Sequence, residues 1–171
     1  MRRLTALGVL VLSAFFGGCS AQAATYTEVR AETLDTLQTV SNFVPEPKQI
    51  LVTPEFDPYP CKDVLTAQPA AGAFFTGQWA LFVGDDFDIP QFVREVPHLL
   101  GDDWRVEELG IPVEFAEVYL VRSAPRMTLK IEESTIDGRK ALDLLAISRC
   151  GSITADERLA TWPPPTPEPA P

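Results

Sequence analysis

The chain has 171 residues, of which 46% are hydrophobic and 22% are charged, and its formal net charge is −10. This composition is typical of one globular domain and excludes disordered, collagen-like and coiled-coil chains. Because the acidic balance leaves no basic surface for phosphate groups, we expect no nucleic-acid partner. Composition alone indicates no biochemical activity.

The first residues have the pattern of an export signal. Arg2 and Arg3 precede an apolar run from Leu4 to Phe16, which is shorter than the roughly 20 residues of a membrane-spanning helix. A basic start followed by a short apolar core is typical of a signal peptide. We therefore expect residues 1–18 to direct export, with twin-arginine export as a weaker alternative because the arginine pair lacks the usual flanking residues. No later stretch is apolar for long enough to act as a membrane span.

Two processing sites follow this apolar core. Phe16-Gly17-Gly18-Cys19 resembles the lipobox of bacterial lipoproteins, although that family usually has Leu where Phe16 stands. The resemblance implies that the Cys19 thiol receives a diacylglyceryl group and that Cys19 becomes the mature N-terminus. Residues 19–24 would then form a tether that spans about 20 Å when stretched. The alternative is secretory cleavage at Ala21-Gln22-Ala23, which releases a protein without a lipid anchor.

The two remaining cysteines, Cys61 and Cys150, form an even number in a chain routed to an oxidising compartment. We predict that they form a disulfide bond, which the chain-entropy model values at about 4 to 5 kcal/mol for so long a loop. A reactive or metal-binding pair is the alternative, but no nearby His or third Cys completes a ligand set.

Two amphipathic helices are predicted. The first begins at Thr25, which with Glu28 has the spacing of a capping box, and Pro45 ends it. Its buried face has small or apolar residues at helical spacing: Tyr26, Val29, Thr33, Leu37, Val40 and Val44. The second helix begins at Asp88, and Pro97 is expected to kink or shorten it. Its inner side is predicted to carry Phe92, Val96, Leu99 and Leu100.

The rest of the domain is predicted to be irregular or β-structured. Residues 45–72 are rich in proline and show no periodicity, so we expect an irregular segment held by Cys61. Residues 74–83 indicate a buried strand. Turn signals then separate four strands of an antiparallel meander, predicted at residues 104–109, 115–122, 127–133 and 141–150.

These elements predict an α+β fold with an antiparallel sheet of about five strands, two covering helices and one disulfide. In the last strand Leu142, Leu144, Ala146, Ser148 and Cys150 share one parity, so we expect Cys150 to face the covered side of the sheet. The single domain is expected to span residues 25–160. Residues 161–171 form a proline-rich tail, which favours an extended spacer.

The sequence contains no recognisable catalytic motif. Its only histidine, His98, lacks a companion motif, and it is better explained as a helix-end residue than as a base. The acidic runs at residues 85–88, 102–103 and 107–108 contain possible cation ligands or an acid/base pair, but their spacing fits no calcium loop. Asp88 is instead predicted to cap the second helix. We expect no catalytic residue, no metal and no cofactor.

Aromatic side chains leave one further possibility. Several lie on predicted strands, where core packing is the simpler explanation and an apolar pocket for a lipid or glycan is the alternative. They are Phe75, Trp79, Phe82, Trp104, Phe115 and Tyr119.

The overall pattern resembles small exported lipoproteins of actinobacteria. The residues that carry this resemblance are the lipobox-like start, the strand ending at Ser148-Arg149-Cys150, and the stretch from Trp104-Arg105-Val106 to Leu109-Gly110. The resemblance implies an envelope location and an α+β fold, and it assigns no catalytic residue.

We therefore expect a lipid-anchored, non-enzymatic domain at the extracytoplasmic face of the cell membrane, which binds or scaffolds an envelope protein or a small apolar ligand. Two alternatives remain open. One is a lipid or glycan carrier with its pocket between helices and sheet, and the other is a hydrolase that uses carboxylates.

Overall fold

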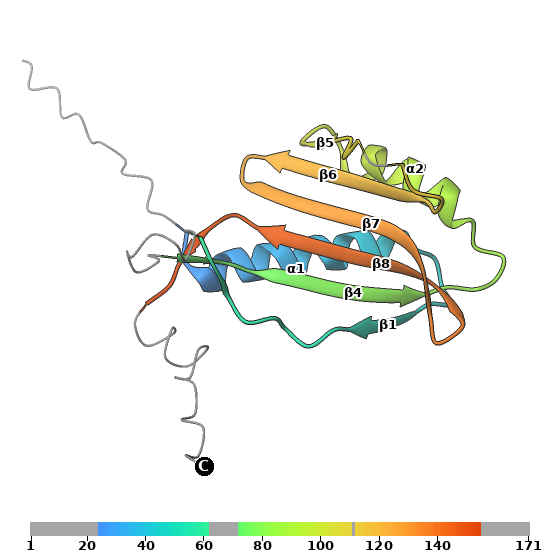
Figure 1. Ribbon diagram of the computed structural model, residues 1–171, viewed down its shortest axis with the longest axis horizontal. Helices are drawn as coiled ribbons and strands as arrows, with labels where there is room; N and C mark the ends of the chain where they lie inside the picture. Colours follow the sequence, from blue (N-terminus) through green and yellow to red (C-terminus); the bar gives the residue numbers. More distant parts are fainter. Residues whose placement is uncertain (1–23, 62–71, 111, 155–171) are drawn as a thin grey trace, which may run out of the picture.

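Two helices lie against one face of a six-stranded antiparallel sheet in the computed structural model (Figure 1). The structure describes residues 24–61, 72–110 and 112–154. The predicted signal peptide, Cys19 and the proline-rich tail lie outside these residues. The described elements are, in chain order, α1 (Tyr26–Phe43), β1 (Gln49–Val52), β2 (Tyr59–Pro60), β3 (Gly72–Phe74), β4 (Thr76–Phe82), α2 (Ile89–Leu100), β5 (Trp104–Val106), β6 (Glu117–Ser123), β7 (Arg126–Ile136), β8 (Arg139–Ser148) and β9 (Gly151–Ser152).

The fold is α+β, as predicted, with one more strand in the main sheet than expected and a second, smaller sheet. The large sheet has the order β1-β4-β8-β7-β6-β5, and β2, β3 and β9 form the small one. The four strands predicted after the second helix are present as the consecutive neighbours β5 to β8. Their ends differ from the prediction. Most notably, β5 stops at Val106 and β8 stops at Ser148.

Helix α1 confirms its prediction in detail. The Thr25 hydroxyl accepts a hydrogen bond from the Glu28 amide, and the Glu28 carboxylate accepts one from the Thr25 amide, which completes the capping box. The helix ends at Phe43, just before Pro45. All six residues of the predicted inner face are buried.

Helix α2 begins as predicted, because the Asp88 carboxylate accepts a hydrogen bond from the Gln91 amide at 2.8 Å. Pro97 does not shorten it, since the helix continues to Leu100. The predicted inner position of Leu99 is wrong. The Leu99 side chain is 48% exposed, because it lies at the margin of the apolar face in the last turn. Leu100 packs against the core, as predicted.

The segment from residue 45 to 72 is not wholly irregular, which corrects the prediction. β1 pairs with β4 along the edge of the large sheet, and β2 pairs with β3 in the small one. The four residues of β1 are all exposed. An exposed edge strand has no alternation between buried and exposed positions, so the periodicity that marks a half-covered strand was absent.

The two faces of the large sheet differ. The covered face packs against α1 over β4 and β8 and against α2 over β5 to β7. Its side chains form the main core, with members that include Trp79, Leu81, Leu120, Leu129, Ile131, Leu142 and Leu144. Alternation places the intervening residues of each strand on the opposite face, here called the open face.

The disulfide between Cys61 and Cys150 is present, with an S–S distance of 2.05 Å. The prediction that Cys150 faces the covered side of the sheet is wrong. β8 ends two residues earlier, and Cys150 is exposed in the turn to β9. Beside the bond, the Ser152 amide donates to the Ala24 carbonyl oxygen at 2.7 Å. The start of α1, the small sheet and the disulfide therefore lie together at one end of the domain, here called the disulfide end (Figure 1).

Candidate functional site

The fold does not bring His98 and the three acidic runs of the sequence together in one site. His98 lies exposed in the last turn of α2, where a helix C-terminus favours a cation. Asp88 caps the start of the same helix, and Asp102 and Asp103 follow its end. Within the described ranges, no three His, Cys, Asp or Glu side chains are grouped so as to hold a metal ion. The third acidic pair, Glu107 and Glu108, lies elsewhere and lines a groove.

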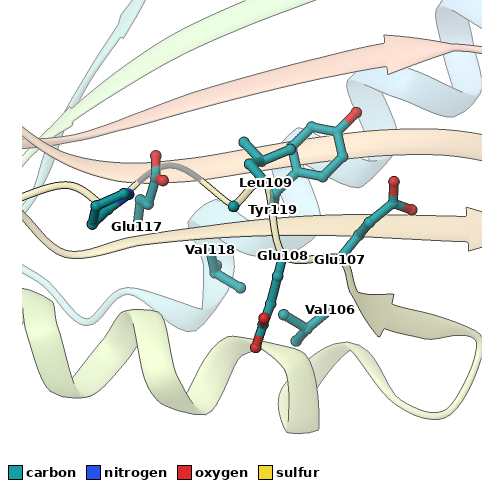
Figure 2. Close-up of a pocket in the computed structure, with 9 residues that line it drawn as sticks. Val106, Glu107, Glu108, Leu109, Glu117, Val118 and Tyr119 are labelled. Carbon is teal, nitrogen blue, oxygen red and sulfur yellow. The ribbon is translucent and has the colours of Figure 1, made fainter.

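This groove, here called the β5–β6 groove, has a volume of about 420 Å³ (Figure 2). It begins where β5 ends. The amide of Glu107 donates to the Tyr119 carbonyl oxygen at 2.9 Å, and the chain then leaves the sheet through a turn at Gly110, whose φ is +70°. Glycine adopts this backbone conformation without steric cost. The lining residues are Val106, Glu107, Glu108, Leu109, Gly110, Pro112, Glu117, Val118 and Tyr119.

The departure of the chain leaves part of β6 without a paired strand on the groove side among the residues that the structure describes. In an antiparallel ladder, residues point their N–H and C=O groups alternately to one neighbour and to the other. The Tyr119 carbonyl oxygen accepts its hydrogen bond from Glu107, on the β5 side. Glu117 lies two residues before Tyr119 in the same strand, so it directs its N–H and C=O to that side as well. The extended line of β5 would place Leu109 opposite Glu117, but β5 ends at Val106. Within the described part of the chain, the groove therefore contains an open strand edge.

Apolar side chains form both walls of the groove. Leu109 and Tyr119 lie side by side on the open-face side, while Val106 and Val118 point toward α2 (Figure 2). Val106 and Leu109 are 54% and 49% exposed. Of the aromatic residues considered above, Tyr119 lines this groove and Phe115 is exposed, whereas Phe75, Trp79, Phe82 and Trp104 are buried. The groove is thus a partly apolar surface.

The charge of this surface is acidic. Among the described residues that line the groove, three carry carboxylates, Glu107, Glu108 and Glu117, and none is basic. Arg105 lies 3.5 Å from the Glu107 carboxylate, but both side chains are largely exposed, so water screens this pair. A positively charged group is therefore the favoured electrostatic complement.

The acidic character continues across the open face. Glu117 pairs directly with Glu132 on β7, and Glu132 pairs directly with Asp143 on β8. These three residues form what we call the carboxylate row. Like charges on directly opposed strand positions destabilise a sheet, so the row has a cost in folding free energy.

Two polar neighbours partly compensate this cost. Lys130 lies 2.6 Å from the Glu132 carboxylate, and the Gln78 amide donates to both oxygens of Asp143, at 3.0 and 2.9 Å. Burial raises the pKa of Asp143, and the negative charge of Glu132 adds to the increase, while the Gln78 hydrogen bond opposes it. The row therefore keeps an electrostatic strain that a bound cation would relieve.

Sequence reasoning missed this site. The sequence indicates Glu107 and Glu108 only as possible catalytic or metal-binding carboxylates. The turn signals at Gly110 and Pro112 predict the end of a strand, but they place that end at residue 109 instead of Val106. Knowledge of the strand register is needed to see that β5 ends early and that Glu117, Glu132 and Asp143 align.

Neither of the two described helices is both long and apolar enough to cross a membrane. Comparison of the chain with known protein families, with curated proteins and with solved structures found no match.

Proposed function

We propose that this protein is an exported lipoprotein, fastened through Cys19 to the extracytoplasmic face of the cell membrane, whose domain is a non-enzymatic binding or scaffolding module. The observation that carries the proposal is the disulfide between Cys61 and Cys150. Disulfides persist in oxidising compartments and are rare in the cytosol. The bond agrees with an apolar leader that precedes Cys19, and the likeness to actinobacterial lipoproteins adds weight to the proposal.

The position of the groove suits such an anchor. Ala24, which follows the proposed tether, is bonded to Ser152 at the disulfide end. Tyr119 and Glu117 lie level with Leu145 and Asp143 of β8, three and five residues before Ser148. At about 3.4 Å per residue, this places the groove roughly 10 to 17 Å farther along the strands. A short tether then holds the disulfide end at the membrane and leaves the groove accessible to a partner.

A carrier of lipid or glycan has less support. Such a carrier needs an enclosed space between helices and sheet, but the side chains there, including Leu81, Leu120 and Leu142, have no exposed surface. The groove is instead an open hollow at the rim of the sheet (Figure 2). A binding surface for a partner fits this shape better than a container for a small apolar molecule.

Intact-mass analysis of the membrane-extracted protein tests the anchor. The expected mass is that of residues 19–171 with a diacylglyceryl group and one disulfide. In a Cys19→Ser variant the protein should leave the membrane fraction, because it has no thiol to acylate. A variant in which Cys61 and Cys150 are both Ser is the matched control, since it loses the disulfide and keeps the anchor.

Two results would overturn the proposal. A product that starts at Ala24 and accumulates outside the cell would show secretory cleavage at the alternative site. A product that retains Met1 inside the cell, with all three thiols reduced, would show that the chain is not exported.

A further inference from the structure

We propose that the β5–β6 groove and the carboxylate row form one docking surface for an extended, basic segment of a partner protein, which adds to the edge of β6. This inference rests on the proposed binding function and does not depend on the lipid anchor. It assigns both the class of partner and its mode of binding.

The open strand edge is the first part of this inference. Glu117 directs its backbone N–H and C=O into the groove, and β5 ends before it reaches them. An incoming strand that continues the line of β5 satisfies both groups, as in peptide binding by strand addition. The hydrogen bonds give affinity, and the side chains on alternate positions give specificity.

The side chains on the two sides of this edge specify the partner. On the α2 side, the exposed Val106 and the buried Val118 offer apolar contacts, and the Glu108 carboxylate lies between them (Figure 2). On the open face, Glu117 and Glu132 present two adjacent carboxylates, of which that of Glu132 also lies 2.6 Å from the Lys130 ammonium. A strand that alternates apolar and basic residues therefore places its apolar side chains against the valines and its basic side chains against the carboxylates.

Charge also excludes the other occupants. The whole chain has a net charge of −10, and the groove lining has three carboxylates without a basic residue. A second copy of this chain or an acidic ligand would add like charges at the same place. A basic segment instead relieves the repulsion between directly opposed carboxylates, so binding recovers part of the free energy that the row costs.

Fluorescence anisotropy with labelled short peptides tests this surface on the mature protein. The probe is a peptide of four Lys-Val repeats, which has the required alternation. Its affinity should fall about tenfold when Glu117→Gln and Glu132→Gln are combined, because two favourable charge contacts are lost. The matched control combines Asp35→Asn and Glu95→Gln, which removes two exposed carboxylates on the helices and should leave the affinity within about twofold.

A second peptide tests strand addition itself. Four Lys-Pro repeats have the same charge, but proline has no backbone N–H and is excluded from a fully paired strand. We expect this peptide to bind at least about tenfold more weakly than the Lys-Val peptide, from the loss of edge hydrogen bonds and apolar contacts. Equal affinity of the two peptides, or no effect of the double Glu substitution, would overturn the inference.

The mass of Cys19 separates this inference from the proposed anchor. An acylated protein whose groove variant binds as tightly as the wild type would retain the anchor and refute the docking surface. An unmodified Cys19 in a protein that binds the Lys-Val peptide through Glu117 and Glu132 would refute the anchor and support the docking surface.

Discussion

The two faces of the six-stranded sheet differ in how far their side chains are buried. On the covered face, Leu129 and Leu144 have no exposed surface because the helices pack over them. On the open face, the neighbouring positions Lys130 and Asp143 are polar and only partly buried. The same strands thus supply the core with one set of residues and a surface that contains the carboxylate row with the next. Stability depends mainly on the first set, and we propose that part of the second set binds a partner.

The largest expected effect comes from removing the same atoms on each face in turn. Leu144→Ala should destabilise the domain by about 3 kcal/mol, because it leaves a cavity beneath the helices. Leu145→Ala, one residue along β8 on the open face, should cost less than about 1 kcal/mol, because water already reaches this side chain. Denaturant unfolding of both variants measures the difference. Equal losses would mean that the open face is also covered.

The aromatic side chain of Phe82 is buried on the open face without a helix, and a smaller effect is expected there. Phe82 is 7% exposed, and the guanidinium of Arg139 lies 3.9 Å from its ring centroid. Arg139→Ala should destabilise the domain by about 1 kcal/mol, through the lost cation–π contact and the lost cover. Arg94→Ala, at an exposed site on α2, is the control for loss of charge and should have little effect. If both arginine variants unfold alike, the stacking contributes nothing.

The covered face was also the part that could be predicted from the sequence. Periodicity reports burial on one side, so the inner residues of α1 and the buried parity of β8 were correctly assigned. β1 gave no such signal, since its residues are exposed on both faces. Cys61 and Cys150 could be paired by counting, but the exposed position of Cys150 depends on where β8 ends.

The candidate site could not be predicted because it depends on the register of three strands. Glu117, Glu132 and Asp143 are far apart in sequence, and none belongs to a motif. They become neighbours only through the pairing of β6, β7 and β8. The groove likewise exists because β5 ends at Val106, whereas the sequence pattern predicts a strand that continues to residue 109. Local patterns describe single elements, and this surface is made between elements.

In the carboxylate row, a substitution is expected to raise the free energy of unfolding, whereas those above lower it. Glu117→Gln should stabilise the domain by about 0.5 kcal/mol, because it removes the repulsion with the directly opposed Glu132. Glu114→Gln, at an exposed position just before β6, should change the free energy of unfolding by less. Thermal or denaturant unfolding at low ionic strength measures both. A destabilised Glu117 variant would contradict the view that the row is strained.

The smallest expected effect is the pH dependence of the row. Burial and the charge of Glu132 raise the pKa of Asp143, so the fold favours its protonated form more than the unfolded chain does. The stability that comes with protonation is fully present below the unfolded pKa and is lost as the pH rises through the folded pKa. The wild type should therefore gain stability relative to Asp143→Asn as the pH falls from neutral toward the ordinary aspartate pKa.

Glu28, in the capping box, is expected to give the opposite pH dependence of stability, so it is the internal control. Hydrogen bonds from the Thr25 amide and hydroxyl lower its pKa, so its contribution is present above the unfolded pKa and is lost as the pH falls through the folded pKa. Relative to Glu28→Gln, the wild type should lose stability on acidification, whereas relative to Asp143→Asn it should gain. Denaturant midpoints across the acidic range test both slopes. Parallel curves for wild type and Asp143→Asn would mean that Asp143 titrates as an ordinary surface carboxylate and that the open face carries no strain at this position.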